Sequence, residues 1–180
     1  VGTEPEVIDQ VLGEPPPEYD LAARDRFREA VAARYGVAPG EVVPTLGASG
    51  ALFVAHATLL ERGQRLLVES PSYEPLWRGA EALGIAVDRF ERRFDAGFTL
   101  EPDAILEALT PETRVVAVTN PHNPTGVVLD DTTIRAVATA LAARNVTLLI
   151  DEAYLELPRP ATTARVLGAN VMTCSSATKC

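Results

Sequence analysis

The stretch Thr119–Gly126, which reads TNPHNPTG, constrains the fold of this chain more than any other segment. It follows the continuous apolar run Val115–Val118, which is typical of a buried parallel strand. Two prolines and a glycine end that strand, and each proline biases the residue before it, Asn120 or Asn123, towards extended backbone. We therefore expect two side-chain amides at the carboxyl end of a strand, where open α/β sheets bind ligands. The alternative is a turn that uses Asn and Pro only for its shape.

Two later strand-like runs also end in polar residues. The run Val146–Ile150 is followed by Asp-Glu-Ala-Tyr at residues 151–154, and the run Val171–Thr173 is followed by Cys-Ser-Ser-Ala-Thr-Lys at residues 174–179. Because the carboxyl ends of parallel strands lie along one edge of a sheet, these groups should gather near the Asn-Pro turn. The three strand ends then present an amide, an acid with a phenol, and hydroxyls with an amine.

In combination and in this order, the three motifs resemble those of the fold-type-I pyridoxal-phosphate (PLP) enzymes, specifically the class I/II aminotransferases of the aspartate aminotransferase superfamily. The matching patterns are Asn-Pro-x-Asn-Pro-Thr-Gly, Asp-Glu-x-Tyr and Ser-x-Thr-Lys, the last in place of the commoner Ser-x-Ser-Lys. The resemblance extends from about Tyr19 to the last residue. It implies PLP as cofactor, and an amino acid and a 2-keto acid as substrates.

Elsewhere, strand-like runs alternate with helix-like segments, and this order predicts parallel βαβ units. The expected fold class is α/β: three layers with a mostly parallel sheet flanked by helices, as in the large domain of PLP-dependent transferases. We expect an extended connector over residues 1–19 and part of the PLP-binding large domain over residues 20–180. The expected helices cover residues 20–35, 51–60, 76–83, 101–109 and 130–145, and the expected strands cover residues 41–45, 65–69, 85–90, 114–119, 146–150 and 171–173.

A small-residue turn, Leu46–Gly50, lies between an expected strand and an expected helix. Such a turn exposes free backbone N–H groups at a helix N-terminus, which suits an anion. By itself such a turn is weak evidence, and a plain strand-to-helix connection is its usual explanation. The resemblance makes it the phosphate-binding turn, in which Ala48 and Ser49 act through their amides. It adds the hydroxyls of Ser176 and Thr178 as further phosphate ligands.

The resemblance also assigns the remaining cofactor contacts. Tyr73 would stack on the pyridine ring, although an aromatic residue that only begins the next helix is the alternative. Asp151 would keep the ring nitrogen protonated by charge pairing. Asn123 and Tyr154 would hydrogen-bond the phenolic oxygen. Lys179, the only lysine of the chain, would form the Schiff base and move protons as general base and acid.

One residue is a candidate for a contact between subunits. In the family, a Tyr before the first long helix reaches the partner subunit's cofactor phosphate, and Tyr19 lies near that position. The alternative is an aromatic residue that anchors the helix. The resemblance implies a homodimer, and a length about twice that of this chain, so the small C-terminal domain and the arginine that binds the substrate carboxylate are expected beyond it. We expect the 180 residues alone to be inactive.

Bulk properties exclude several other classes. A formal charge of −9 argues against nucleic acid and anionic membranes as partners. No apolar run approaches the ~20 residues of a membrane span, and acidic residues within Val1–Leu12 argue against a signal peptide. Cys174 and Cys180 form neither a disulfide framework nor a metal-ligand set, so we interpret them as reduced thiols of a cytoplasmic protein.

Two alternative functions share the cofactor motifs. Another fold-type-I enzyme, such as a C–S lyase or an amino-acid decarboxylase, would differ in residues outside this chain. A PLP-binding regulator domain would carry a DNA-binding module before this region, and no such module is recognisable in the sequence before Tyr19.

Some polar residues are expected to serve structure. Arg92 and Arg93 are interpreted as a solvated surface, His56 as a packed or capping residue, and Glu152 as structural. Asn120 has either a structural or a substrate-side role, and His122 is assigned no chemistry.

Overall fold

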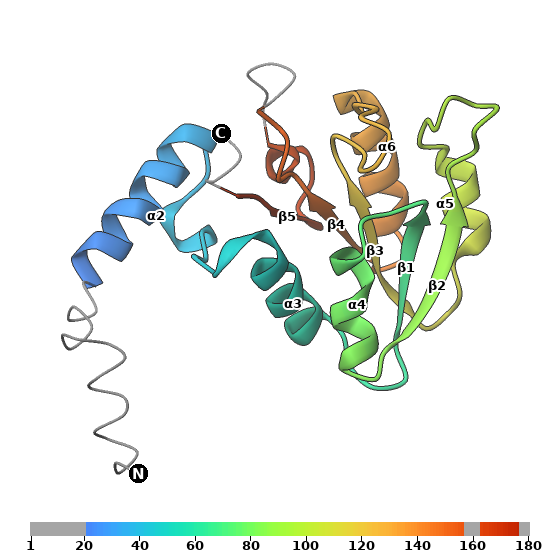
Figure 1. Ribbon diagram of the computed structural model, residues 1–180, viewed down its shortest axis with the longest axis horizontal. Helices are drawn as coiled ribbons and strands as arrows, with labels where there is room; N and C mark the ends of the chain where they lie inside the picture. Colours follow the sequence, from blue (N-terminus) through green and yellow to red (C-terminus); the bar gives the residue numbers. More distant parts are fainter. Residues whose placement is uncertain (1–20, 157–162, 177–180) are drawn as a thin grey trace, which may run out of the picture. The chain divides into compact units, whose positions relative to one another are not determined.

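The computed structural model describes residues 21–156 and 163–176, in two compact units (Figure 1). The first unit, Val1–Pro44, contains helix α2 (Leu21–Tyr35) and the 3₁₀ helix η1 (Pro39–Glu41). Helix α2 ends as expected at Gly36, which has a φ of +68°. The connector expected over residues 1–19 and the first residue of the helix expected over residues 20–35 lie outside the described residues.

The prediction of a strand over residues 41–45 is wrong. Pro39 begins η1 instead, and the Glu41 carboxylate accepts a hydrogen bond from Ala38 N at 2.9 Å. The backbone oxygen of Val42 accepts from the Arg28 guanidinium at 3.1 Å, and Val43 is 71% exposed. Apolar residues in a short run are not a strand when neither face is covered and no ladder pairs them.

The second unit, Thr45–Cys180, contains a five-stranded parallel sheet in the order β2-β1-β3-β4-β5. Each expected strand from residue 65 onwards is confirmed to within one residue at either end. The observed strands are β1 (Arg65–Ser70), β2 (Ala86–Glu91), β3 (Thr113–Thr119), β4 (Thr147–Asp151) and β5 (Val171–Cys174).

Helices cover both faces of this sheet (Figure 1). Successive residues of β1 face opposite cores: Leu66 and Val68 pack in the core with α3 (Gly47–Leu59) and α4 (Pro75–Ala82). Leu67 packs in the other core, with α5 (Pro102–Ala108) and α6 (Asp131–Ala142). Because both faces are buried, the central strands are continuous apolar runs. The expected three-layer α/β fold is confirmed.

The N-termini of helices α6 and α3 can be compared with the predicted helix starts. Asp130, the first residue of the helix expected over residues 130–145, caps α6, because its Oδ1 accepts a hydrogen bond from Thr133 N at 2.8 Å. Helix α3 begins at Gly47, four residues before the expected start at residue 51. The small-residue turn is therefore itself the first turn of the helix.

The strand order fixes where a ligand can bind. Strand β2 lies on one side of β1, whereas β3, β4 and β5 follow one another on the other side. The direction in which the chain winds therefore reverses between β1 and β3. In open parallel sheets, a crevice forms beyond the carboxyl ends of the strands at this switch point.

Candidate active site

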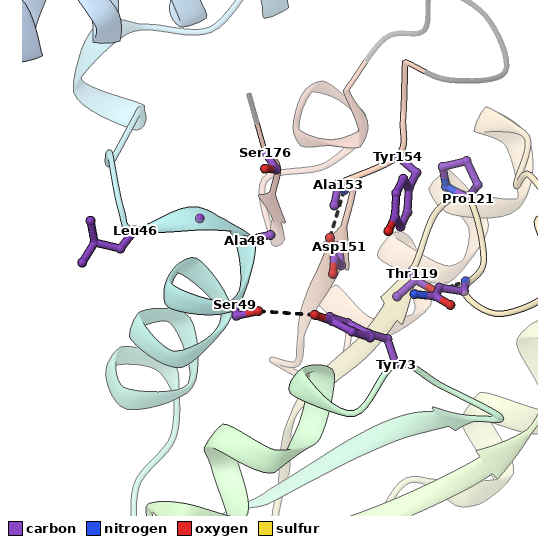
Figure 2. A pocket seen from close by; sticks show the side chains of 12 residues that line it. Leu46, Ala48, Ser49, Tyr73, Thr119, Pro121, Asp151, Ala153, Tyr154 and Ser176 are labelled. Atoms are coloured by element: carbon purple, nitrogen blue, oxygen red, sulfur yellow. Dashed lines mark hydrogen bonds between the residues drawn. The ribbon is translucent and has the colours of Figure 1, made fainter. Parts of the chain in front are cut away.

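A cavity of about 240 Å³ lies at this switch point (Figure 2). Residues from the first turn of α3 and from the carboxyl ends of β1, β3, β4 and β5 line it. The lining residues are Leu46, Gly47, Ala48, Ser49, Tyr73, Thr119, Pro121, Asn123, Asp151, Ala153, Tyr154 and Ser176. The structure thus brings together all seven expected site residues that it describes: Ala48, Ser49, Tyr73, Asn123, Asp151, Tyr154 and Ser176.

The remaining expected site residues, Tyr19, Thr178 and Lys179, lie outside the described residues. Ser176 is buried at the cavity and is the last described residue of the chain. Lys179 follows it by three positions in the sequence.

One wall of the cavity is the N-terminus of α3. The residue before this helix, Leu46, supplies no side-chain cap for the first-turn N–H groups. Ala48 and Ser49 belong to this first turn, and the Ser49 hydroxyl lies 3.5 Å from the Tyr73 hydroxyl (Figure 2). Uncapped amides and the helix dipole together favour an anion at this wall.

Another residue that lines the cavity is Asp151, whose carboxylate lies at the end of β4. Asp151 is 5% exposed, and its Oδ1 accepts a hydrogen bond from Ala153 N at 2.9 Å. Burial raises the pKa of this carboxyl, and the Ala153 hydrogen bond acts in the opposite direction. Within the described parts of the chain, no basic side chain forms an ion pair with it. A buried carboxylate that faces a cavity in this way favours a cationic ligand group.

The adjacent acid, Glu152, is not among the residues that line the cavity. Its Oε2 accepts from the Thr163 hydroxyl at 2.6 Å, and its Oε1 accepts from Ala164 N at 2.7 Å. Burial raises the pKa of Glu152 to about 7, against these hydrogen bonds and with a contribution from the Asp151 charge. Glu152 therefore joins the end of β4 to the 3₁₀ helix η2 (Ala164–Leu167), in the structural role expected for it.

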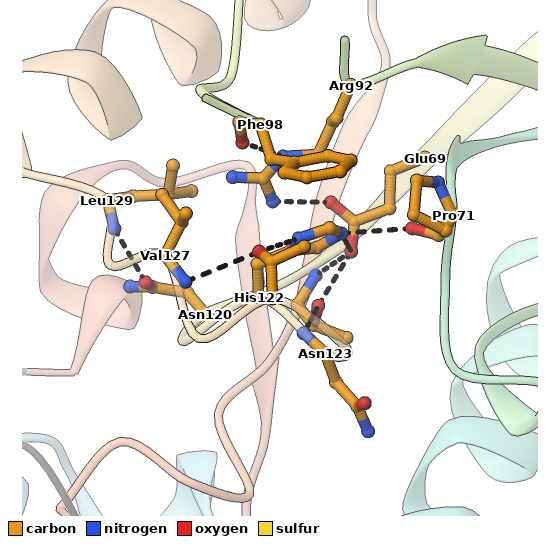
Figure 3. A network of polar contacts seen from close by, with 11 residues as sticks. Glu69, Pro71, Arg92, Phe98, Asn120, His122, Asn123, Val127 and Leu129 are labelled. Carbon is orange, nitrogen blue, oxygen red and sulfur yellow. Dashed lines mark hydrogen bonds and ion pairs between the residues drawn. The ribbon is translucent and has the colours of Figure 1, made fainter. Parts of the chain in front are cut away.

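The interpretation of Arg92 as a solvated residue is wrong. Arg92 is 1% exposed, and its Nη1 donates to Glu69 Oε2 at 2.9 Å in a fully buried ion pair (Figure 3). Arg93 is exposed and pairs with Asp95, as a surface residue does. The sequence did carry a signal for the buried pair. Glu69 follows the apolar Leu66–Val68 run, and a carboxylate in a buried strand needs a partner.

Asn120 and His122 have structural roles in the Asn-Pro turn. The Asn120 side-chain oxygen accepts from Leu129 N at 2.9 Å. His122 Nε2 lies 2.9 Å from the backbone oxygen of Pro71, and its Nδ1 lies 2.6 Å from the Thr125 hydroxyl. Since the Pro71 carbonyl can only accept, Nε2 carries the proton. Burial lowers the pKa of His122, as does the Arg92 charge, so the ring is neutral.

Two further buried groups of the second unit belong to the core around α3. His56, within this helix, is packed as expected and fully buried. Cys174 is a free thiol, and burial raises its pKa to about 12, so it is not a thiolate near neutral pH. Cys180 lies outside the described residues. None of the helices in the described part of the chain has the length and apolarity that crossing a membrane requires.

The sheet and cavity together define an α/β domain that offers an anion site and a buried carboxylate to a ligand at its switch point. The sequence model that describes aminotransferase class I and II matches residues 19–179. The chain therefore belongs to the class I and II aminotransferase family, whose members depend on PLP.

Individual relatives agree with this assignment. The chain is 37% identical over 123 residues to a probable N-acetyl-LL-diaminopimelate aminotransferase of Bacillus subtilis. This match covers 67% of this chain and 30% of that protein. The solved N-succinyldiaminopimelate aminotransferase of Mycobacterium tuberculosis matches with a TM-score of 0.77 and 31% identity, over 86% of this chain and 44% of that one. Aspartate aminotransferase of Thermus thermophilus with maleate matches with a TM-score of 0.76 and 29% identity, over 85% and 42%. The chain thus spans less than half the length of each.

Proposed function

We propose that this chain forms the cofactor-binding part of a PLP-dependent aminotransferase that moves an amino group between an amino acid and a 2-keto acid. The observation that carries the proposal is the Asp151 carboxylate, which is buried at the cavity without an ion-pair partner among the described residues. A protonated pyridine nitrogen supplies the charge that this carboxylate needs. The uncapped first turn of α3 fits the cofactor's phosphate.

The cavity residues divide by the part of the cofactor that each would hold. Ala48 and Ser49, through backbone amides, and the Ser176 and Thr178 hydroxyls would bind the phosphate. The Tyr73 ring would cover one face of the pyridine. The Asn123 and Tyr154 side chains would donate to the phenolic oxygen. PLP, when bound in this way, acts as an electron sink for the bonds at the substrate's α-carbon.

Lys179 would attach the cofactor and then move the proton. Its sequence position, three residues after Ser176, supports this role, as does the Ser-Ala-Thr-Lys motif. An amine with an ordinary pKa near ~10.4 is protonated at neutral pH, so Lys179 would act as a base only in its neutral form. Once free, Lys179 Nζ would take the proton from the α-carbon of the substrate and return it to a carbon of the cofactor.

Family membership also supports a proposal for the partner subunit and the compartment. We propose a cytoplasmic homodimer acting in amino-acid metabolism, in which Tyr19 reaches the cofactor phosphate of the second subunit.

The test of cofactor attachment uses the full-length natural protein. Incubation with PLP followed by borohydride reduction should fix one label per chain, and peptide mapping should place it on Lys179. Lys179→Arg keeps the positive charge and should abolish the label while the protein remains folded. A label at any other position, or none on a folded protein, would contradict the proposal.

The test of the ring-nitrogen contact is Asp151→Asn. This variant should still bind PLP but should lose turnover by about 100-fold or more, because the neutral amide no longer stabilises the protonated ring. Glu152→Gln is the matched control, since it changes the neighbouring buried acid in the same way and should retain turnover. Tyr154→Phe should have a smaller effect than Asp151→Asn. Normal turnover by Asp151→Asn would refute the assignment of this carboxylate.

A further inference from the structure

A network of buried polar groups lies behind the cavity and ends at Asn123 (Figure 3). Its centre is Glu69, which is fully buried. Glu69 Oε1 accepts from Thr119 N at 2.6 Å and from the Thr119 hydroxyl at 2.7 Å. Glu69 Oε2 accepts from Arg92 Nη1 at 2.9 Å. Three donors thus converge on the two carboxylate oxygens, which is the arrangement that binds an ionised carboxylate.

The carboxylate fixes the orientation of the Thr119 hydroxyl. A hydroxyl has one proton to donate, and that proton is directed at Glu69. The remaining lone pairs of the oxygen accept from Asn123 N at 2.9 Å. The hydroxyl therefore connects the buried ion pair to the backbone of a residue that lines the cavity.

The other end of the network is also fixed. Arg92 Nε donates to the backbone oxygen of Phe98 at 2.8 Å, and Arg92 N donates to the backbone oxygen of Ser70 at 2.8 Å. Arg92 is thus attached to the end of β1 through its backbone and to the loop that follows β2 through its guanidinium. Figure 3 shows the Asn123 side chain extending away from the network, on the side opposite to Glu69.

We propose that Thr119 is a positioning residue for the reaction, whose hydroxyl, oriented by Glu69 and Arg92, holds the Asn123 backbone so that the Asn123 amide meets the cofactor's phenolic oxygen. This inference rests on the proposed function, in which Asn123 is that hydrogen-bond donor. Arg92 and Glu69 act only through Thr119 and the turn, and Asn123 is the member of this chain that would contact the cofactor. A donor that is displaced by a fraction of an ångström loses much of its hydrogen bond, so the backbone anchor sets the strength of the contact.

The chain supplies a matched pair of substitutions on one strand. Thr119→Val, at the carboxyl end of β3, removes the hydroxyl and keeps the branched shape. Thr113→Val, at the other end of β3, makes the same change at a residue that is also buried, 1% exposed. The Thr113 hydroxyl bonds Thr110 N at 3.0 Å and the Thr110 hydroxyl at 3.2 Å, away from the cavity. Both variants lose the hydrogen bonds of one buried hydroxyl, but only Thr119 is connected to Asn123.

Two measurements on the full-length protein test the proposal. The first is amide hydrogen exchange at Asn123 in the cofactor-free protein, which does not depend on the proposed function. Thr119→Val should exchange this amide about tenfold faster than the wild type, the effect of losing one hydrogen bond of ordinary strength. Thr113→Val should leave it unchanged.

The second measurement is the absorption of bound PLP as a function of pH, together with the PLP dissociation constant. Asn123→Ala should move the midpoint of the absorption change and weaken binding. Thr119→Val should move the midpoint in the same direction by a smaller amount and weaken binding by about 3- to 10-fold. Thr119→Ser, which keeps the hydroxyl, should match the wild type, and Thr113→Val should lower thermal stability without moving the midpoint.

The outcomes separate this inference from the proposed function. Unchanged exchange in Thr119→Val overturns the inference, and so does faster exchange with an unchanged midpoint and affinity, which would make the network purely structural. If Asn123→Ala leaves the midpoint unchanged, the Asn123 contact and this inference both fail. If the label of the borohydride test is absent from Lys179 of the wild type, the proposed function fails by itself. Should Thr119→Val not fold, Thr119→Cys gives the same two measurements, because a thiol keeps a weakly polar group beside Glu69.

Discussion

Adjacent acids in this chain have different roles because their surroundings differ. Asp151 lies at the cavity with one hydrogen bond from a backbone amide, whereas Glu152 is satisfied by a hydroxyl and an amide of the η2 segment. Burial raises the pKa of both. The carboxylate that the protein leaves without a charged partner among the described residues is the one that a cationic ligand group can stabilise.

The pKa of Glu152 predicts a pH dependence of stability. Its pKa is raised from 4.5 to about 7 in the folded chain, so the folded state binds this proton more tightly than the unfolded state. The resulting stabilisation is complete below about 4.5 and is lost as the pH rises through about 7, by at most about 3 kcal/mol. Glu152→Gln should remove this slope.

The measurement is the denaturant midpoint of the cofactor-free protein between pH 5 and 8. The wild type should lose stability relative to Glu152→Gln as the pH rises. Asp151 contributes a slope of the same sign in both proteins, so it largely cancels in the comparison. Parallel curves for the two proteins would show that Glu152 has an ordinary pKa.

Sequence reasoning found seven of the residues that line the cavity, and it missed Thr119 in the cavity wall and the buried Glu69–Arg92 pair beyond it. Asp151, Asn123 and Tyr154 stand in motifs at strand ends, so their spacing alone brings them together. The burial of Arg92 was missed because a sequence does not show that two charged residues twenty-three positions apart, Glu69 and Arg92, form a buried ion pair. An arginine beside another arginine in a charged loop is usually solvated, and here the fold contradicts that expectation.

At the scale of elements, the strands were predictable and the beginning of α3 was not. The central strands are buried on both faces, so their apolar runs match their bounds. Helix α3 begins earlier because Gly47, with a φ of +71°, turns the chain directly into the helix. The sequence led us to expect the helix only from residue 51, after the small-residue turn. The difference matters because it places Ala48 and Ser49 within the first helical turn.

This beginning of α3 predicts the effect of Gly47→Ala. An added Cβ would meet nothing within 4 Å, so the cost is only the positive φ, about 1 kcal/mol. Relaxing that strain would rotate the amides of the first turn, and the affinity for PLP should fall by about 3- to 10-fold.

Gly84→Ala is the control for this substitution. Gly84 has a φ of +78° and equally open space, but it precedes β2 at the end of the sheet opposite to the cavity. Both variants should lose similar thermal stability, and only Gly47→Ala should bind PLP more weakly in equilibrium titration. Equal affinities would show that the first turn of α3 does not hold the phosphate.

At the scale of the whole molecule, the described residues line the proposed cofactor site but show no site for a substrate carboxylate. The described residues that line the cavity include neither arginine nor lysine. A carboxylate is usually oriented by a bidentate arginine, and that orientation contributes strongly to rate. The chain also spans less than half the length of the relatives compared here.

We therefore predict that residues 1–180 expressed alone do not transaminate. Among the described strands, β5 pairs only with β4, and Met172 on it is 36% exposed. An open edge of this kind promotes association between chains, so the isolated piece should aggregate and bind PLP weakly. The measurement is the half-reaction with a panel of amino acids, monitored by the absorbance of PLP. The full-length protein is the control. Turnover by the piece at about 1 s⁻¹ or faster, within the usual range of complete enzymes, would mean that these 180 residues already contain the carboxylate site. The arginine responsible would then have to be sought in this chain, by substituting in turn those nearest the cavity.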